Sequence, residues 1–186
     1  SALGSLVNTM EMYMHYFLGY YQEVDRYIAV SKFYQKKMVE AGFPEDQISY
    51  LPNFIDVDKF DHLAEDKGYV LYFGRLSEEK GIYTYLSAAM SNSEIPHYIV
   101  GTGPLEDELI RSKNDQGADN VQFLGFKTGE ALKDLISGCT CVVVPSEWYE
   151  NCPMSVLEAY AAGRPVIGSN IGGIPELIED QEDGFI

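Results

Sequence analysis

The strongest indication of the fold comes from residues 141–163, which read CVVVPSEWYENCPMSVLEAYAAG. The apolar run Cys141–Val144 has the length and β-branched composition of a buried strand. Pro153 suits the first turn of a helix and Gly163 suits the residue after its end, so we expect a helix over residues 153–162. This arrangement directs backbone amides and the positive end of the helix dipole beyond the end of the strand, which favours anion binding there.

The alternation of strand and helix continues through most of the chain. Apolar segments with helical spacing, such as Ile82, Leu86 and Ala89, separate short runs that are β-branched or aromatic. The runs that we expect to be strands are Tyr27–Val30, Tyr69–Phe73, His97–Val100, Val121–Leu124, Cys141–Val144 and Val166–Ile167. The predicted fold class is therefore α/β, a Rossmann-like parallel sheet with helices on both faces, whose ligands bind beyond the carboxyl ends of the strands.

The first fifty residues follow a different pattern. They contain an aromatic-rich amphipathic stretch, Met10–Tyr21, then one strand, then a charged helix capped by Ser31 and closed by Gly42. So few elements do not bury a core of their own. We expect a domain boundary near residue 55, with the α/β domain over residues 56–186 and residues 1–50 docked on that domain or on protein absent from this sequence.

Composition excludes several classes of function. The formal net charge of −16 argues against a nucleic-acid partner and against simple electrostatic docking on anionic lipid. No apolar run reaches the roughly 20 residues of a membrane span, so no transmembrane segment is expected. Cys139, Cys141 and Cys152 are odd in number and distant in sequence from every histidine, which favours reduced thiols, a cytoplasmic location and no metal site.

Two carboxylates and two cations are the candidates for chemistry. Glu150 precedes the helix expected at residues 153–162, and Glu158 lies within it. A carboxylate accepts two hydrogen bonds side by side, as the vicinal diol of a ribose or hexose requires, although solvated or capping glutamates explain the same spacing. Arg75 and Lys80 follow an expected strand and form a natural phosphate-binding pair, although loop cations are usually solvated or ion-paired.

Two glycine-containing loops also follow expected strands. Gly101-Thr102-Gly103 lacks the third glycine of the dinucleotide fingerprint, so we interpret it first as a tight turn and second as a ligand loop, and a classical NAD site is disfavoured. Gly172-Gly173 allows a ligand or another chain segment to approach the backbone, and packing alone also explains this pair.

Taken in order, these motifs resemble one family, the retaining GT-B glycosyltransferases known as group 1 or family 4. The resemblance covers roughly residues 24–186. The segments that carry it are Asp25–Ser31, Pro52–Asp56, Gly74–Leu76, Lys80–Gly81, Val100–Leu105, Val121–Gly125, Glu150–Glu158, Gly163–Ile167 and Gly172–Glu176.

The resemblance implies a role for each candidate residue. It assigns Arg75 and Lys80 to the diphosphate of the donor, Glu158 to the ribose hydroxyls and Glu150 to the transferred sugar, with Arg75, Lys80 and Glu150 as the catalytic set. Further substrate contacts are expected from Gly74, Gly125, Phe126, Lys127, Met154 and Ser155. This chain departs from the commoner family pattern at Asn151–Met154, where Pro153 supplies no amide to the ligand.

The implied reaction is transfer of a sugar from a nucleotide-diphospho-sugar to an acceptor with retention of configuration and without a metal or other cofactor. The chain would be the donor-binding half of a protein that is truncated here at both ends, so the isolated chain is expected to bind a nucleotide without necessarily transferring sugar. The implied acceptor is a sugar or glycolipid, which leaves open peripheral association with the inner membrane face. The alternatives are a nucleotide-binding module without catalysis and another GT-B enzyme such as a sugar-nucleotide epimerase.

Overall fold

The computed structural model describes residues 2–62 and 64–186 of the chain. The first part contains a small parallel sheet with one helix packed on it. Its elements are α1 (Ala2–Phe17), η1 (Tyr20–Glu23), β1 (Tyr27–Ala29), α2 (Lys32–Glu40), η2 (Glu45–Gln47) and β2 (Ile48–Tyr50). Strand β2 was not expected from the sequence, because it has three residues with only Ile48 buried, too few to show a strand pattern.

The expected capping of α2 is confirmed. The amide of Tyr34 donates to Oγ of Ser31 over 3.0 Å, so Ser31 is the N-cap. After the helix, Gly42 has φ +91° and its amide donates to the carbonyl of Val39, as at a helix end that needs a left-handed residue.

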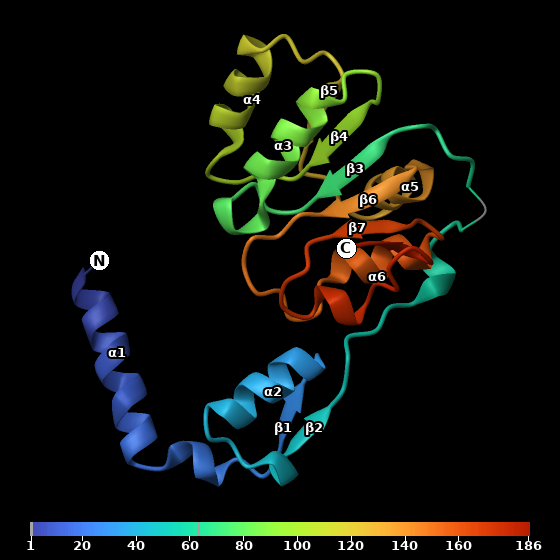
Figure 1. Cartoon of the computed structure of the whole chain (residues 1–186). Coiled ribbons are helices and arrows are strands. Elements are labelled where there is room, and N and C mark those ends of the chain that lie inside the picture. Colours follow the sequence, from blue (N-terminus) through green and yellow to red (C-terminus); the bar gives the residue numbers. More distant parts are fainter. Residues whose placement is uncertain (1, 63) are drawn as a thin grey trace.

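Helix α1 stands away from the larger sheet (Figure 1). Its apolar side chains, among them Leu6, Met10, Tyr13 and Phe17, are exposed to solvent. In the described residues, none of the helices has both the length and the apolar character needed to cross a membrane.

The larger sheet lies within residues 64–186, and its neighbouring strands all pair in parallel. Its strands are β3 (Val70–Phe73), β4 (His97–Val100), β5 (Val121–Gly125), β6 (Cys141–Val144), β7 (Val166–Gly168) and β8 (Gly184–Phe185). Its helices are α3 (Ile82–Ser91), α4 (Glu106–Asp115), α5 (Glu130–Gly138) and α6 (Met154–Ala161), with single turns η3 (Val57–Lys59), η4 (Glu78–Lys80) and η5 (Ile174–Glu176). The two-residue strand β8 was also not expected.

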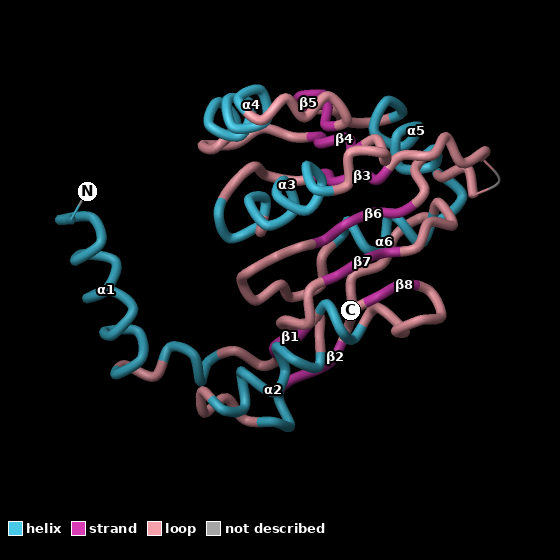
Figure 2. Tube along the Cα trace, turned by 45° about the horizontal axis from the view of Figure 1, so that its top comes forward, coloured by secondary structure: helices cyan, strands magenta, loops and turns pink. Residues whose placement is uncertain are grey.

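Helices cover both faces of this sheet (Figures 1 and 2). Successive strand residues point to opposite faces, so Leu71 joins a core cluster with α5 and α6, whereas Tyr72 joins another with α3 and α4. The strands are consequently apolar on both faces, as a buried parallel sheet requires. The predicted α/β fold class is confirmed.

The strand order locates the ligand crevice. The order is β5-β4-β3-β6-β7-β8, so the chain moves outward from β3 to β5 and then returns to place β6 on the other side of β3. Ligands in open α/β sheets bind beyond the carboxyl ends of the strands at this reversal. The loops after β3 and β6 are the two that carry the candidate cations and Glu150.

One helix boundary differs from the prediction. Helix α6 begins at Met154, with Pro153 in extended conformation as its N-cap, so Pro153 is not the first helical residue. Gly163 follows the helix with φ +67°, as expected for a residue just past a helix end.

Candidate donor-binding site

A cavity of about 430 Å³ lies where the loops after β3 and β6 meet the start of α6. It brings together most of the residues that the sequence predicts for the site. Those that line it are Gly74, Arg75, Lys80, Glu150, Met154, Ser155 and Glu158.

Lys80 reaches this cavity because of Gly81. With φ +65°, Gly81 ends the turn η4, and a Cβ atom at this position would lie 1.8 Å from the carbonyl oxygen of Pro145. The glycine therefore lets the loop after β3 pack directly on the end of β6. Nζ of Lys80 then lies 2.5 Å from Oε1 of Glu150, and that oxygen also accepts from Oγ of Ser146 over 2.8 Å.

Arg75 is held by its backbone while its side chain remains exposed. The hydroxyl of Tyr72 donates to the carbonyl of Arg75 over 2.8 Å, and the amide of Leu76 donates to the carbonyl of Thr102 over 3.0 Å. No salt bridge or hydrogen bond joins the guanidinium to another residue in the described part of the chain. Its charge is thus available to an anionic ligand.

The Gly101–Gly103 loop has a packing role. A Cβ atom at Gly101 would lie 1.8 Å from the carbonyl oxygen of Gly74, and one at Gly103 would lie 2.2 Å from that of Leu76. These distances support the tight-turn interpretation. The loop also borders a cavity, because Gly101 and Thr102 line the cavity of about 310 Å³ that is described below.

The backbone of Gly172 and Gly173 packs against the backbone of Glu150 and Asn151. The amide of Gly173 donates to the carbonyl of Glu150 over 2.7 Å. Cβ atoms would lie 2.4 Å from the carbonyl oxygen of Glu150 at Gly172 and 1.9 Å from that of Asn151 at Gly173. These glycines permit backbone packing, and the segment they contact is the loop that carries Glu150.

Glu158 lies inside the cavity on α6. Its side chain is half-buried, and burial raises the pKa of the carboxyl above its ordinary value. No salt bridge to Glu158 occurs among the described residues. The carboxylate is therefore available to hydroxyl donors of a ligand, which would replace the water it has lost.

A second cavity of about 310 Å³ adjoins the first through Phe73, Gly74 and Arg75. Phe126 and Lys127 line it, and the ring of Phe126 is largely exposed. Gly125 is not among the lining residues. It ends β5 with φ +68°, and its carbonyl accepts from the amide of Gly101 over 2.9 Å. The predicted site residues other than Gly125 thus line two adjoining cavities, and Gly125 is hydrogen-bonded to Gly101, which lines the second.

Residues from the first part of the chain hold the loop after β6. Oγ of Ser31 donates to Oδ1 of Asn151 over 2.6 Å, and the side-chain amide of Asn53 donates to the carbonyl of Cys152 over 3.0 Å. The carboxylate of Glu176 accepts from the amides of Lys32 and Phe33 at the start of α2. Ser31, Asn53 and Glu176 belong to segments that carry the family resemblance, but the sequence assigns none of them a role in holding this loop, and it carries no signal for Ser146.

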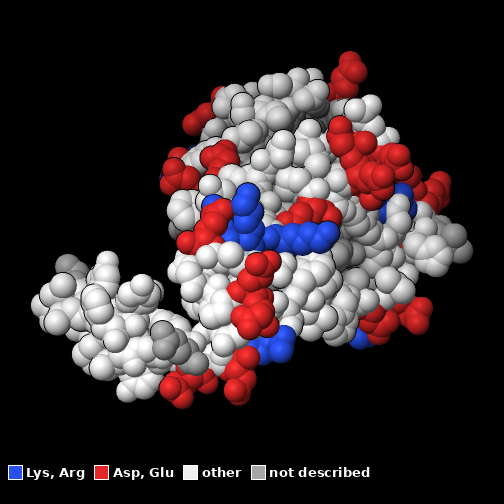
Figure 3. All heavy atoms as spheres, turned by 60° about the horizontal axis from the view of Figure 1, so that its bottom comes forward, with Lys and Arg blue, Asp and Glu red and all other residues white. Residues whose placement is uncertain are grey.

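The charged side chains are unevenly distributed over the surface. Figure 3 shows lysine and arginine side chains gathered near the centre of one face, with acidic side chains beside them and around the edge. Across the described residues, no three side chains of His, Cys, Asp or Glu are arranged to hold a metal ion. The three cysteines are free thiols.

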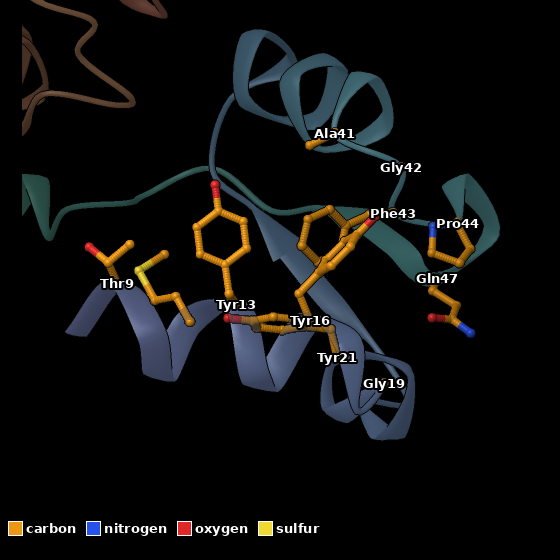
Figure 4. Close-up of a pocket in the computed structure, with 11 residues that line it drawn as sticks. Thr9, Tyr13, Tyr16, Gly19, Tyr21, Ala41, Gly42, Phe43, Pro44 and Gln47 are labelled. Atoms are coloured by element: carbon orange, nitrogen blue, oxygen red, sulfur yellow. The ribbon is translucent and has the colours of Figure 1, made fainter. Parts of the chain in front are cut away.

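A larger cavity, of about 840 Å³, lies between α1 and the segment that follows α2 (Figure 4). Figure 4 shows Tyr13 and Tyr16 on α1 at one side of it and Phe43 and Pro44 at the other. The ring of Tyr21 packs against Phe43, with 6.2 Å between the ring centroids. None of its lining residues is Asp, Glu, Lys or Arg. It offers neither cations for a phosphate nor a carboxylate for a hydroxyl, so it is not the candidate site.

Comparison with known proteins shows which proteins the chain resembles. A family model described as "Glycosyl transferases group 1" matches residues 54–186. An uncharacterized glycosyltransferase of Methanocaldococcus jannaschii is 33% identical over 179 residues, covering 85% of this chain and 45% of the relative. The amylovoran biosynthesis glycosyltransferase AmsK of Erwinia amylovora is 28% identical, covering 86% of this chain and 42% of its own length.

Among solved structures, Alr3699/HepE of Anabaena in complex with UDP and glucose has a TM-score of 0.77 and 25% sequence identity. The match covers 87% of this chain and 48% of that protein. The chain therefore spans about half the length of these relatives.

Proposed function

The chain belongs to the group 1 glycosyl transferases, and from that premise we propose that its cavity at the ends of β3 and β6 binds a nucleotide-diphospho-sugar whose sugar is transferred to an acceptor. The observation that carries the proposal is that two cations, two carboxylates and the start of α6 line one cavity at the reversal of strand order. Cations and helix amides bind a diphosphate, and carboxylates bind hydroxyl groups.

In this proposal Arg75 and Lys80 bind the diphosphate, with help from the amides of Met154 and Ser155. Glu158 accepts from the ribose hydroxyls, and Glu150 faces the transferred sugar. The base occupies the adjoining cavity beside Phe126 and Lys127. The Anabaena structure, which holds UDP and glucose, supports a nucleotide sugar as the ligand class.

The proposed chemistry is displacement at the anomeric carbon with retention. The bond from that carbon to the diphosphate oxygen breaks, a bond from the acceptor oxygen forms on the same face, and the acceptor proton passes to the departing phosphate. Negative charge grows on the leaving group, so fixed cations lower the barrier most. Loss of Arg75 or Lys80 should slow transfer on the order of 10²-fold, by analogy with removed oxyanion donors. We propose that these steps use no metal, because Arg75 and Lys80 supply the positive charge at the leaving group.

The activity of the whole protein is part of the same proposal. Residues 1–55 would belong to an acceptor domain and its crossover, and residues 56–186 to the donor domain. The acceptor would be a sugar or glycolipid in polysaccharide assembly, handled in the cytoplasm or at the inner membrane face. The relative named for amylovoran biosynthesis supports this class of product.

Calorimetric titration of the chain with UDP, GDP and ADP in the presence of a chelator tests the donor site. We expect one nucleotide to bind, and binding to be lost in the Arg75→Ala/Lys80→Ala double variant and in Glu158→Ala. Lys59→Ala is the control, because Lys59 is an exposed cation paired with Asp56 outside both cavities. Equal affinity in the site variants and the control would overturn the proposal.

A further inference from the structure

A fourth cavity shares Glu150 with the donor cavity but has different chemistry. Its volume is about 380 Å³, and it lies between α2 and the loop after β6. Aromatic rings from both sides line it, Phe33 and Tyr34 from α2 and Trp148 and Tyr149 from the loop. Trp148 is 68% exposed and Tyr149 is 61% exposed, so both rings are available to a ligand.

Contacts between α2 and the loop after β6 hold these rings in place. The ring centroids of Phe33 and Tyr149 lie 5.1 Å apart, so the aromatic wall bridges α2 and the loop. Beside it, Ser31 donates to Asn151 over 2.6 Å, which joins the same two elements. A side-chain wall fixed in this way loses little conformational freedom when a ligand binds.

The polar groups at the edge of this cavity favour a neutral ligand over an anionic one. Lys37 is paired with Glu40 over 2.7 Å, so its charge is already balanced. Glu150 is likewise paired with Lys80, so no unpaired cation for a phosphate or carboxylate is found among the described residues that line this cavity. The amide of Asn151 and the hydroxyls of Tyr34 and Tyr149 offer neutral hydrogen bonds. Aromatic faces combined with neutral polar groups suit a pyranose ring, which has an apolar C–H face and hydroxyls at its edge.

We propose that this cavity is the subsite for a pyranose ring of the acceptor, stacked on Trp148 and Tyr149. The inference rests on the proposed function, because only a donor in the neighbouring cavity makes a sugar here an acceptor. Glu150 lies on the wall common to both cavities. An acceptor hydroxyl beside Glu150 would therefore face the sugar of the donor.

Trp148 provides the test, because it is the only tryptophan in the sequence. With UDP bound, the full chain is titrated with methyl glycosides of glucose, mannose and galactose while tryptophan fluorescence is recorded. Single-ring ligands bind weakly, so concentrations up to about 100 mM are needed, around a Kd in the millimolar range. Glycerol at equal concentration controls for solvent effects.

We expect a saturable change with at least one glycoside and a linear or absent change with glycerol. Tyr149→Ala should weaken the response about tenfold, the loss of a stacked ring. Tyr149→Phe, which keeps the ring and loses only the hydroxyl, should weaken the response less than Tyr149→Ala does. Tyr83→Ala, which removes an exposed ring outside the cavity, should leave the response unchanged. Unchanged UDP affinity in Tyr149→Ala would show that the neighbouring loop is still folded.

Two results would count against the inference in different ways. If UDP binds but no glycoside changes the fluorescence saturably, or if Tyr149→Ala responds as the unmodified chain does, the acceptor subsite is wrong and the donor site stands. If calorimetry shows that no nucleotide binds, the proposed function fails and the acceptor assignment fails with it.

Discussion

Lys80 and Glu150 form an ion pair across the candidate donor cavity, with Nζ 2.5 Å from Oε1, although 70 positions separate them in sequence. The pair is partly shielded, with side-chain exposures of 35% and 19%. The cation proposed for the diphosphate is therefore already paired with a carboxylate of the same cavity. A diphosphate that binds here has to share Lys80 with Glu150.

Glu150→Gln should raise the affinity for UDP. The neutral amide removes the competing counter-ion of Lys80, and a pair of this kind contributes about 0.5–1 kcal/mol, or about two- to fivefold in affinity. Calorimetry of UDP binding measures the change. Glu147→Gln is the matched control, because Glu147 belongs to the same loop and contacts Thr84 instead of lining the cavity. A fall in UDP affinity on Glu150→Gln would contradict the competition described here.

UDP affinity should fall as the pH is lowered toward the pKa of Glu158. Burial raises this pKa above the ordinary 4.5, so the carboxyl takes up a proton at a higher pH than a fully solvated carboxyl of this type would. The protonated group loses part of its capacity to accept hydroxyl hydrogen bonds. Titrations at several pH values check this. Because UDP itself also takes up protons, the pH dependence of UDP affinity is compared between the unmodified chain and Glu158→Gln. If UDP affinity changes with pH equally in both, the role of Glu158 is refuted.

The charged form of Glu158 should have opposite effects on UDP binding and on folding stability: it favours UDP binding and lowers the free energy of unfolding. Because the folded-state pKa is raised, the stability linked to this group is fully present at low pH and is lost as the pH rises through the folded-state pKa. At neutral pH, Glu158→Gln should therefore unfold at a higher urea concentration than the unmodified chain while binding UDP less well. A lower midpoint for the variant would show that the carboxylate is stabilised by contacts other than those seen here.

The sequence predicted the parallel sheet because its main strands are continuous apolar runs such as Cys141–Val144. It missed β2 and β8 because two or three residues show no periodicity. It placed Arg75 and Lys80 at the end of a strand, but the adjacency of β3 and β6 that brings Lys80 to Glu150 depends on strand order, which local patterns do not encode.

The contacts that hold the site together were less predictable than its charged residues. Ser146 lies four positions from Glu150 and resembles any loop serine until the fold directs its hydroxyl to the carboxylate. Glu176 is 144 positions from Lys32, and only the packing of α2 against the loop after β7 makes it a helix cap. The paired glycines at 172 and 173 signalled a close approach without identifying its partner.

Gly81→Ala should destabilise the chain more than a glycine substitution at the same backbone angle elsewhere. Both Gly81 and Gly117 have φ near +65°, at +65° and +63°, so alanine costs each about 1–2 kcal/mol of left-handed strain. Gly117 has nothing within 4 Å of its Cβ position, whereas at Gly81 the carbonyl oxygen of Pro145 lies 1.8 Å away. Urea unfolding of the two variants measures the effect of the clash, because the strain at positive φ is common to both. The unfolding midpoint of Gly81→Ala should be lower than that of Gly117→Ala.

The clash should also affect the ligand site. Relieving it moves the loop with Lys80 away from the end of β6, so Gly81→Ala should lose UDP affinity by about tenfold or more, comparable to losing one charge-assisted hydrogen bond. Gly117→Ala should bind UDP as the unmodified chain does. Equal unfolding midpoints and equal UDP affinities in the two variants would mean that Gly81 does not set the position of Lys80.

Glu176→Ala should loosen the start of α2 without changing the donor cavity. The amide of Lys32 donates to Oε2 of Glu176 over 2.7 Å, and the amide of Phe33 donates to Oε1. A lost cap of this kind costs about 1 kcal/mol, which corresponds to about a fivefold fall in hydrogen-exchange protection. Exchange measured at these two amides, with exposed Glu94→Ala as the control, checks the effect. Unchanged protection at Lys32 and Phe33 would show that Ser31 alone caps the helix, whereas a loss of UDP affinity would show that α2 also supports the loop with Glu150.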